Sequence, residues 1–284
     1  MGQQILITGA TSGIGRALAV ELGSRGHGLA LSGRNAGRLA EVAAEVEAAG
    51  APAPVGLAAD LAQRGQAREL AEAALDRLGQ VDVLVNNAAG QVQGLIAGTG
   101  DRDEARDVFE VNVWSALSLI GALVPAMAER GGGKVVNVSS LAHISPYPAL
   151  GHYCASKGAL TTITETLRLE VERHGVHVLE VALGPVDTPG SFQNRLLPGG
   201  DAWLDRTRPG SARAAARAIA GAMDAGRDRL VHPRGLRAVH AFPGLGRRYA
   251  RRMSRRLDLD DVPFRAPGAP EIEAARARWA DAHG

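Results

Sequence analysis

The sequence predicts an α/β fold: a doubly wound parallel sheet of about seven strands, covered by helices on both faces, with a helical extension at the carboxyl end. Two observations predict it. Short runs rich in Val, Leu and Ile alternate with longer stretches whose apolar residues recur at spacings of three and four. Strands separated by helices of about 10 to 15 residues form right-handed βαβ units, and such units make the strands parallel.

The predicted elements follow one another in a regular order. The strand-like runs are Ile5–Thr8, Gly28–Ser32, Pro54–Ala58, Val81–Val85, Lys134–Ser139, Val176–Leu183 and Arg229–Val231. The helical stretches include Ile14–Arg25, Leu39–Ala49, Leu70–Leu78 and Ala159–Arg173, and longer helices are expected at about 104–130 and 151–174. No repeat or linker interrupts the chain before residue 232, so residues 1–231 are predicted to form one domain and 232–284 an extension packed on it.

The composition is that of a cytoplasmic globular protein. Hydrophobic residues make up 45% of the chain and charged residues 22%, which is typical of a protein with a substantial core. The single cysteine, Cys154, has no partner for an internal disulfide, and this suits a reducing compartment. The sequence has no apolar run of about 18 residues, and Gln4 to Thr8 reads as a buried strand rather than as part of a signal peptide. We therefore expect a cytoplasmic protein without a membrane span.

A glycine-rich turn follows the first predicted strand. The segment TGATSGIG, residues 8–15, ends that strand and opens a helix. Glycines in such a Rossmann-type turn let backbone N–H groups approach a pyrophosphate at the positive end of the helix. The turn predicts a dinucleotide site, although any turn before a helix tends to use glycine. The expected contacts are Thr8, Gly9, Thr11, Ser12, Gly13, Ile14 and Gly15.

The second strand ends in a turn that favours NADP(H). Folds selective for NAD usually carry an acidic residue here, which binds the ribose 2′-hydroxyl. In this chain Gly33 takes that position and Arg34 follows it. A guanidinium matches the geometry of a 2′-phosphate, and a missing carboxylate removes repulsion. The alternative is that Arg34 is only a solvated loop residue.

These motifs, together with others further along, resemble the short-chain dehydrogenase/reductase (SDR) family over about residues 4–231. The matches are TGxxxGxG at Thr8, Gly9, Gly13 and Gly15, Asp60-Leu61 after the third strand, NNAA at 86–89, Asn112, VNVSS at 136–140, and YxxxK at Tyr153 and Lys157. The resemblance implies that Asp60 and Leu61 contact adenine and that Asn87, Ala88 and Ala89 line the cofactor site. It also implies that Asn112 holds a water that connects Lys157 to solvent.

The Tyr153–Lys157 pair predicts acid–base chemistry. Residues i and i+4 share one face of a helix. A nearby ammonium favours the phenolate form of a tyrosine and lowers its pKa from the usual value of about 10. Tyr153 is then able to donate a proton to a carbonyl oxygen as hydride reaches its carbon, or to remove it in reverse. The resemblance makes Ser140 the hydroxyl that orients the carbonyl, while Ser139 is expected to point the other way. The alternatives are an exposed Tyr–Lys pair and an ordinary pair of serines at a strand end.

The segment LGPVDT, residues 183–188, differs slightly from the family pattern. The resemblance implies that Val186 and Thr188 hold the nicotinamide carboxamide, but Leu183 replaces the usual proline. His143 stands where the family commonly has glycine, either facing the substrate or, as the favoured interpretation, as a hydrogen-bonded loop residue. We expect Cys154 to be a packed residue rather than a redox group. No metal site is predicted.

The substrate is the least determined feature. Residues 189–210 have the Gly and Pro content of a mobile lid. Its large apolar residues favour a lipophilic carbonyl or alcohol, or else they fasten the lid to the core; they are Phe192, Leu196, Leu197 and Trp203.

The extension carries a basic amphipathic pattern. Residues 229–257 contain nine arginines and no Asp or Glu, so the formal net charge of +2 hides an acidic body. Within 243–257, apolar residues recur every four positions, at Leu245, Tyr249, Met253 and Leu257. Such a helix can lie on an anionic membrane, bind nucleic acid or pack on the body of the protein. Packing on the body is the favoured interpretation, peripheral membrane contact is the second, and no nucleic-acid partner is expected.

The sequence therefore predicts an NADP(H)-dependent oxidoreductase that interconverts a carbonyl and an alcohol. An NADP(H)-sensing binding protein is an alternative, but the presence of Ser140, Tyr153 and Lys157 argues against it. A ketoreductase for carrier-bound acyl chains is another, for which the basic extension is atypical. The resemblance also implies a homodimer built on the helices at 104–130 and 151–174, or a homotetramer, although the extension after residue 231 argues against the second doubling.

Overall fold

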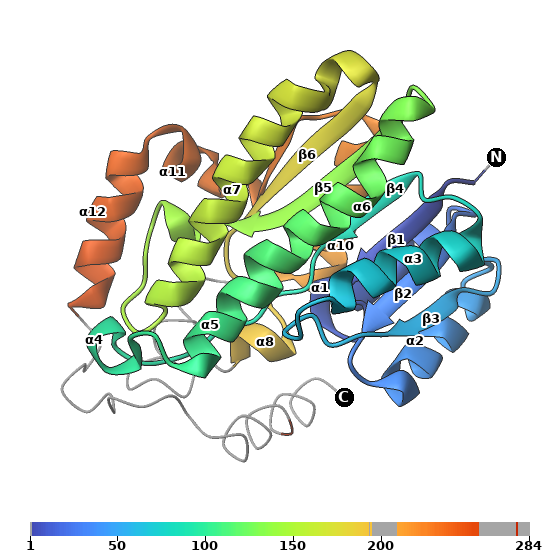
Figure 1. The fold of residues 1–284 in the computed structure, drawn as a ribbon. Helices are drawn as coiled ribbons and strands as arrows, with labels where there is room; N and C mark the ends of the chain where they lie inside the picture. The colour runs from blue at the N-terminus through green and yellow to red at the C-terminus, as the bar shows by residue number, and fades with distance from the viewer. Residues whose placement is uncertain (1, 193, 195–208, 256–276, 278–284) are drawn as a thin grey trace.

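A parallel sheet of seven strands forms the centre of the protein in the computed structural model, which describes residues 2–192, 194, 209–255 and 277 (Figure 1). The strand order is β3-β2-β1-β4-β5-β6-β9. The strands are β1 (Gln4–Thr8), β2 (Gly28–Gly33), β3 (Val55–Ala58), β4 (Val83–Asn86), β5 (Gly133–Ser140), β6 (Val176–Leu183) and β9 (Arg229–His232). All pairs are parallel, so the predicted α/β fold is confirmed.

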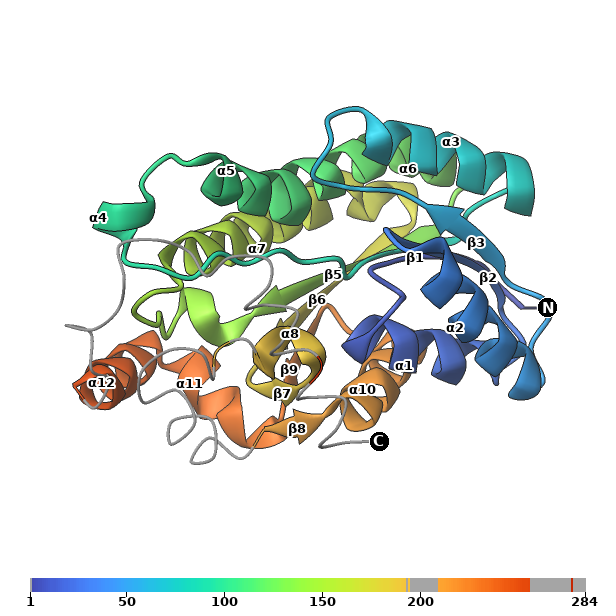
Figure 2. The same cartoon turned by 90° about the horizontal axis from the view of Figure 1, so that it is seen from below.

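Helices cover both faces of this sheet, as Figure 2 shows. One layer holds α1 (Gly13–Gly23), α2 (Ala36–Ala48) and α10 (Ala212–Asp224), and the other holds α3 (Gln66–Leu78), α6 (Ser115–Glu129) and α7 (Gly151–Val171). Each layer buries its own apolar cluster against the sheet. Leu18 and Ile219 belong to the first cluster, and Leu70 and Leu119 belong to the second. Strands that are buried on both faces consist almost entirely of apolar residues.

Several elements are shorter or more broken than the sequence predicts. The helix expected at about 104–130 begins with α5 (Asp103–Phe109), passes through a π-helical turn at Glu110–Trp114 and continues as α6. By length and apolar composition the stretch Asp103–Glu129 is able to cross a membrane, but half of its most apolar window is buried in this fold. The remaining elements are α4 (Ile96–Thr99), β7 (Val186–Asp187), α8 (Pro189–Phe192) and β8 (Gly210–Ser211).

After β9 the chain forms α11 (Arg237–Ala241) and α12 (Pro243–Ser254). Helix α12 contacts the body, but not through the large apolar residues of its sequence pattern. Gly246 and Ala250 face inward, whereas Leu245 is 53% exposed and Tyr249 is 45% exposed. Small residues allow closer approach of the helix backbone, which explains why they form the contact. The side chain of Met253, and Leu257, lie outside the described residues.

Most of the predicted lid also lies outside the described residues. This applies to Leu196, Leu197 and Trp203, and to the side chain of Phe192. Within the segment 189–210, the described elements are α8 and the start of β8. Strand β8 pairs with β7, which follows β6 in the chain.

Candidate active site

The predicted catalytic side chains come together where β5 ends. Ser140 is the last residue of β5, and the neighbouring helix α7 carries Tyr153 and Lys157 one turn apart. The side chain of Ser140 lies close enough to the Tyr153 phenol to influence its pKa. The Ser140 hydroxyl also donates to the carbonyl oxygen of Leu183, 3.3 Å away, on the paired strand β6. A hydroxyl and a phenol thus lie side by side at the carboxyl edge of the sheet, where open α/β folds bind their ligands.

Burial raises the pKa of Tyr153, and the nearby Ser140 side chain opposes that rise. The direction is opposite to the lowering that the sequence predicts from a nearby ammonium. The geometry gives the reason, because the Lys157 ammonium donates to the carbonyl oxygen of Val138, 2.8 Å away. Its nitrogen lies 5.9 Å from the centroid of the Tyr153 ring. In this arrangement desolvation of the phenol outweighs the attraction of the distant charge.

Lys157 is itself almost completely buried, with 2% of its surface exposed. Burial lowers its pKa to about 8. A lysine with this pKa is partly neutral near physiological pH, so it can exchange a proton without a large free-energy cost. The pair therefore joins a phenol whose pKa is raised with an amine whose pKa is lowered, so two values that nearly coincide in water are moved apart, and the ammonium becomes the stronger acid of the two.

Asn112 occupies the π-helical turn between α5 and α6. Its side chain is 1% exposed, accepts a hydrogen bond from the Gly90 backbone N–H at 2.7 Å and donates to the Gly90 carbonyl at 2.9 Å. It also donates to the Ser156 hydroxyl at 2.8 Å, which ties it to α7 between Tyr153 and Lys157. Single π-helical turns inside α-helices are frequent at functional sites. Here the turn aims one amide at both the loop after β4 and the catalytic helix.

Two neighbours of Ser140 point elsewhere. The Ser139 hydroxyl lies 2.6 Å from the Thr161 hydroxyl on α7, as the alternation of side chains along a strand predicts. His143 contacts the Ser140 carbonyl through Nδ1, and burial lowers its pKa. The interpretation of His143 as a hydrogen-bonded loop residue fits this contact. Cys154 is buried in a small apolar cluster, which agrees with the prediction of a packed residue.

The turn after β1 is held in shape by side chains of β1 and of the loop after β4. The Thr8 hydroxyl donates to the Val85 carbonyl at 3.2 Å and accepts from the backbone N–H groups of Asn87 and Ala88, both at 3.0 Å. The Asn87 amide donates to the Thr8 carbonyl at 2.8 Å. Thr8 and Asn87 are therefore engaged with each other, and they shape the cofactor turn through these internal bonds.

The backbone of this turn fits a pyrophosphate. Gly9 has a φ of +66°, and a Cβ there would lie 2.8 Å from the Cα of Ala88, so no larger residue fits. Ser12 is the N-cap of α1 but makes no capping hydrogen bond with its side chain. Its hydroxyl and the free N–H groups of the first helical turn are thus available to an anion. Ile14 is partly buried against the core and anchors that turn.

The turn after β2 excludes a side chain at the position where an acidic residue binds NAD. A Cβ on Gly33 would lie 2.6 Å from Cγ2 of Thr11. The next residue, Arg34, is exposed, and in the part of the chain that the structure describes it forms no salt bridge. A free guanidinium beside an empty glycine position fits a 2′-phosphate.

The other predicted cofactor contacts surround the same edge of the sheet. Asp60 accepts a hydrogen bond from the Ala62 backbone N–H at 3.3 Å, and the adjacent Leu61 is buried. Thr188 meets the glycine turn, since a Cβ on Gly13 would lie 3.1 Å from its methyl carbon. Of the last two predicted contacts, Val186 is buried and Ala89 is exposed.

Two features of the site are absent from the sequence prediction. Tyr147 packs with Tyr153 on the small cluster around Cys154, and its position in a loop with no periodic pattern gave no signal. Gln91 and Gln93 both donate to the side chain of Asn194, at 3.3 and 3.1 Å, and thereby connect the loop after β4 to the segment after α8. Both residues lie in a segment without helix or strand, so no periodic pattern in the sequence could have indicated this contact.

Comparisons with known proteins agree with this geometry. The chain matches the short chain dehydrogenase family over residues 3–195. It is 38% identical over 189 residues to dehydrogenase/reductase SDR family member 7B of Bos taurus, covering 65% of this chain and 58% of that protein.

Two solved structures are similar to the whole fold. A short chain dehydrogenase/reductase from Burkholderia phymatum in complex with NAD has a TM-score of 0.74 and 29% identity, covering 87% of this chain and 95% of that one. A metagenomic short-chain oxidoreductase in complex with NADP has a TM-score of 0.68 and 28% identity, covering 81% and 96%.

The family match spans more than half of the chain, and the residues that carry the family's motifs meet at one edge of the sheet. The chain belongs to the short-chain dehydrogenase/reductase family and is an oxidoreductase of that family.

Proposed function

We propose that the protein is an NADP(H)-dependent reductase or dehydrogenase that interconverts a ketone or aldehyde and the corresponding alcohol. The observation that carries the proposal is that the Ser140 hydroxyl and the Tyr153 phenol lie together at the end of β5, with the buried ammonium of Lys157 behind them. When bound, the nicotinamide cofactor supplies or accepts a hydride. The protein's own residues must then orient the substrate oxygen and move one proton.

Tyr153 is the general acid and base in this proposal. A raised pKa keeps the phenol protonated at neutral pH, so its proton can be donated to the oxygen of a carbonyl substrate. Ser140 lies beside it and holds the same oxygen. Lys157, whose pKa is lowered to about 8, stabilises the phenolate left behind and resupplies its proton. In the alcohol-oxidising direction each proton moves the other way.

The residues of this chain fit NADP(H) better than NAD(H). Gly33 has no room for an acidic side chain unless Thr11 moves, and Arg34 is exposed and unpaired among the described residues. Related structures hold either cofactor, so the choice rests on these two positions. We further propose a lipophilic substrate, because Tyr147, Tyr153 and buried Leu150 give the site an apolar wall.

A substrate screen tests the proposal. Ketones, aldehydes and alcohols of graded size are incubated with the protein and NADPH or NADP, and cofactor absorbance is followed. We expect turnover of apolar carbonyl compounds that is lost in Tyr153→Phe and kept in Tyr249→Phe, a matched loss of a hydroxyl on the exposed helix α12. Tight binding of NADPH without turnover of any compound would support the alternative of a cofactor-sensing protein.

A further inference from the structure

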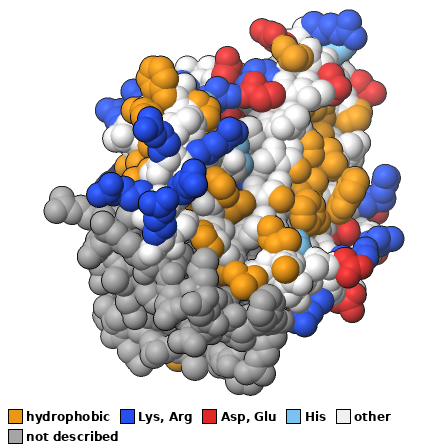
Figure 3. Space-filling view, turned by 90° about the vertical axis from the view of Figure 1, so that its left-hand side faces the viewer, with side chains coloured by type: hydrophobic (Ala, Val, Ile, Leu, Met, Phe, Trp, Pro, Cys, Tyr) orange, Lys and Arg blue, Asp and Glu red, His pale blue; other side chains and the backbone are white. Residues whose placement is uncertain are grey.

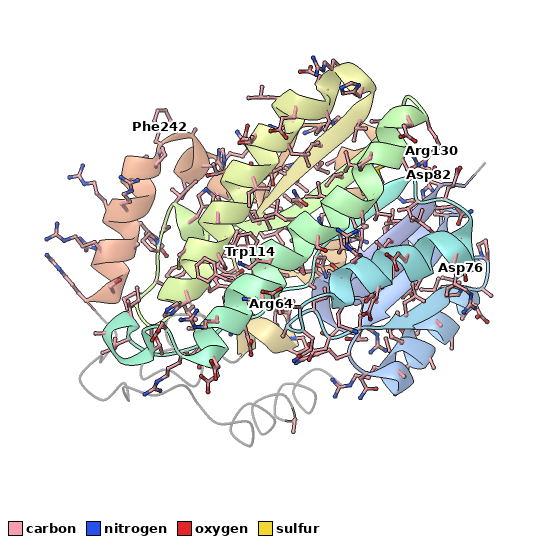
Figure 4. The ribbon with its side chains drawn as sticks, in the orientation of Figure 1. Arg64, Asp76, Asp82, Trp114, Arg130 and Phe242 are labelled. Carbon is pink, nitrogen blue, oxygen red and sulfur yellow. The ribbon has the colours of Figure 1, made fainter. Side chains whose placement is uncertain are left out.

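The helix α12 has three kinds of surface. Its inward side is small, with Gly246 and Ala250 against the body. An apolar stripe comes next: Leu245 is 53% exposed, Tyr249 is 45% exposed, and Phe242, directly before the helix, is 63% exposed. The labelled Phe242 in Figure 4 lies at the N-terminal end of this helix, where α11 joins α12. Exposed apolar residues that follow one another along one helix are typical of an interaction surface rather than of a solvated one.

Arginines border this stripe on the side away from the body. Arg248 and Arg252 follow Leu245 by three and seven residues. At about 100° per residue in a helix, this spacing places both arginines next to Leu245 and Tyr249. Figure 3 shows Lys and Arg side chains gathered over this part of the molecule. Among the described residues, none of the α12 arginines takes part in a salt bridge. Their charge is therefore not neutralised within the described part of the protein.

We propose that Phe242, Leu245 and Tyr249, together with Arg248 and Arg252, form a docking surface for an anionic lipid bilayer. A bilayer has binding partners for both the apolar side chains and the arginines of this surface. Apolar side chains enter the boundary between headgroups and acyl chains, and arginines contact anionic headgroups. The phosphates of a nucleic acid would contact only the arginines and would leave Phe242 and Leu245 exposed to water.

The docking surface is joined directly to the catalytic region. The Ser145 hydroxyl donates to the Gly246 carbonyl at 3.0 Å, and Ser145 follows the short turn that begins at Ser140. Tyr147 packs on the same small cluster as Tyr153 and lies near Tyr249. A bilayer on α12 therefore lies next to the wall of the substrate site, which suits a substrate that partitions into lipid.

The test uses the full-length protein and sedimentation with vesicles. One set is phosphatidylcholine alone, and the other contains added phosphatidylglycerol. We expect sedimentation with the anionic set only, and a decline as salt rises from about 0.1 M to about 1 M, where the Debye length falls to about 3 Å. Neutralising two arginines by Arg248→Gln with Arg252→Gln lowers the partition coefficient on the order of thirtyfold.

Two further variants separate the lipid proposal from general polyanion binding. Phe242→Ser with Leu245→Ser keeps every charge and is expected to abolish vesicle binding. The control is Arg213→Gln with Arg217→Gln, which makes the same charge change on exposed positions of α10 and is expected to bind vesicles as wild type does. Circular dichroism and the Tm confirm that each variant is folded.

Three results would overturn the proposal. One is equal sedimentation with neutral and anionic vesicles. Another is an effect of the α10 control that matches the effect of the α12 arginine variant. The third is a Phe242→Ser with Leu245→Ser protein that still binds anionic vesicles, particularly if duplex DNA competes for the same site.

Discussion

The ammonium of Lys157 points at the backbone carbonyl of Val138, 2.8 Å away, and not at the hydroxyl of the tyrosine one turn earlier on the same helix. This bond fixes the lysine to β5, the strand that also ends in Ser140. The ammonium thus stays behind the phenol in the protein interior, where its desolvation lowers the lysine pKa to about 8. Strand β5 therefore positions two members of the proposed catalytic group: Ser140 belongs to the strand, and Lys157 binds its Val138 carbonyl.

The depressed pKa of Lys157 predicts that stability rises with pH. Between about pH 8 and about pH 10 the unfolded chain still binds the lysine proton while the folded protein has lost it. The unfolded state then holds more protons, so the free energy of unfolding increases with pH in this window. Urea unfolding of wild type and Lys157→Met at pH 7.5 and 9.5 measures the difference. From pH 7.5 to 9.5 we expect the free energy of unfolding of wild type to increase by on the order of 2 kcal/mol more than that of Lys157→Met. Parallel pH profiles of the two proteins would show that the lysine is not desolvated.

Loss of the Tyr153 hydroxyl is predicted to remove turnover and to leave cofactor binding intact. A positioned general acid contributes on the order of a hundredfold to ten-thousandfold to the rate, so Tyr153→Phe should lower kcat by that amount. Fluorescence titration with NADPH should give nearly the wild-type Kd, because the ring remains. A Tyr153→Phe protein with wild-type kcat would contradict the assignment of the acid.

Arg34→Ala is predicted to weaken NADPH binding and to leave NADH binding almost unchanged. Charge-assisted hydrogen bonds contribute about 1.5–3 kcal/mol, so the Kd for NADPH should rise on the order of tenfold to a hundredfold. Arg77→Ala, which removes an exposed arginine from the far end of α3, is the matched control. Equal weakening of both cofactors, or wild-type preference for NADH, would refute the role given to Arg34.

The Asn112 amide is predicted to couple the loop after β4 to α7. Asn112→Ala leaves the Gly90 backbone groups without their side-chain partner and removes one of the two hydrogen bonds of the Ser156 hydroxyl, and a buried group left unsatisfied costs about 1–3 kcal/mol. A double-mutant cycle with Ser156→Ala, followed by urea unfolding, isolates the contribution of their contact. We expect a coupling free energy on the order of 1 kcal/mol, and strictly additive effects would show that the two side chains act separately.

The outer face of the α6–α7 layer is predicted to form a dimer. Trp114, the last residue of the π-helical turn before α6, is 57% exposed and is labelled in Figure 4; Leu169 of α7 is 79% exposed. Large exposed apolar side chains of this kind favour a two-fold contact. Light scattering at micromolar concentration should give a dimer for wild type and a lower mass for Trp114→Ser with Leu169→Ser. Ile96→Ser, a control at a residue 62% exposed on α4, should remain dimeric.

The sequence predicts those parts of the site that lie within one local motif. Tyr153 and Lys157 share a helix face because of their spacing, and Ser140 ends a run of strand-forming residues. The seven strands and their parallel arrangement follow from the alternation of apolar runs with helical stretches. The helix α10 is not among the helices predicted above, because its buried face consists mostly of alanines and gives a weak apolar period.

Contacts between distant segments escape a sequence-based argument. Nothing in the spacing of residues shows that Asn112 binds Ser156, or that the Lys157 ammonium turns to Val138. The same holds for α12, where the periodic residues Leu245 and Tyr249 predict the wrong buried face. Periodicity detects large apolar residues, whereas the contact that forms depends on how closely two backbones approach.

The bonds between Thr8 and Asn87 have a thermodynamic consequence. Because they fix the nucleotide turn within the folded protein, the entropy of ordering that turn is lost during folding and not during binding. The turn also depends on β1 and β4 remaining adjacent, so the nucleotide binds the assembled sheet and not a separable loop. By mass action, a nucleotide at a hundred times its Kd then stabilises the whole domain by about 2.7 kcal/mol. Saturation with cofactor should slow hydrogen exchange in the central strands as well as at the glycine turn.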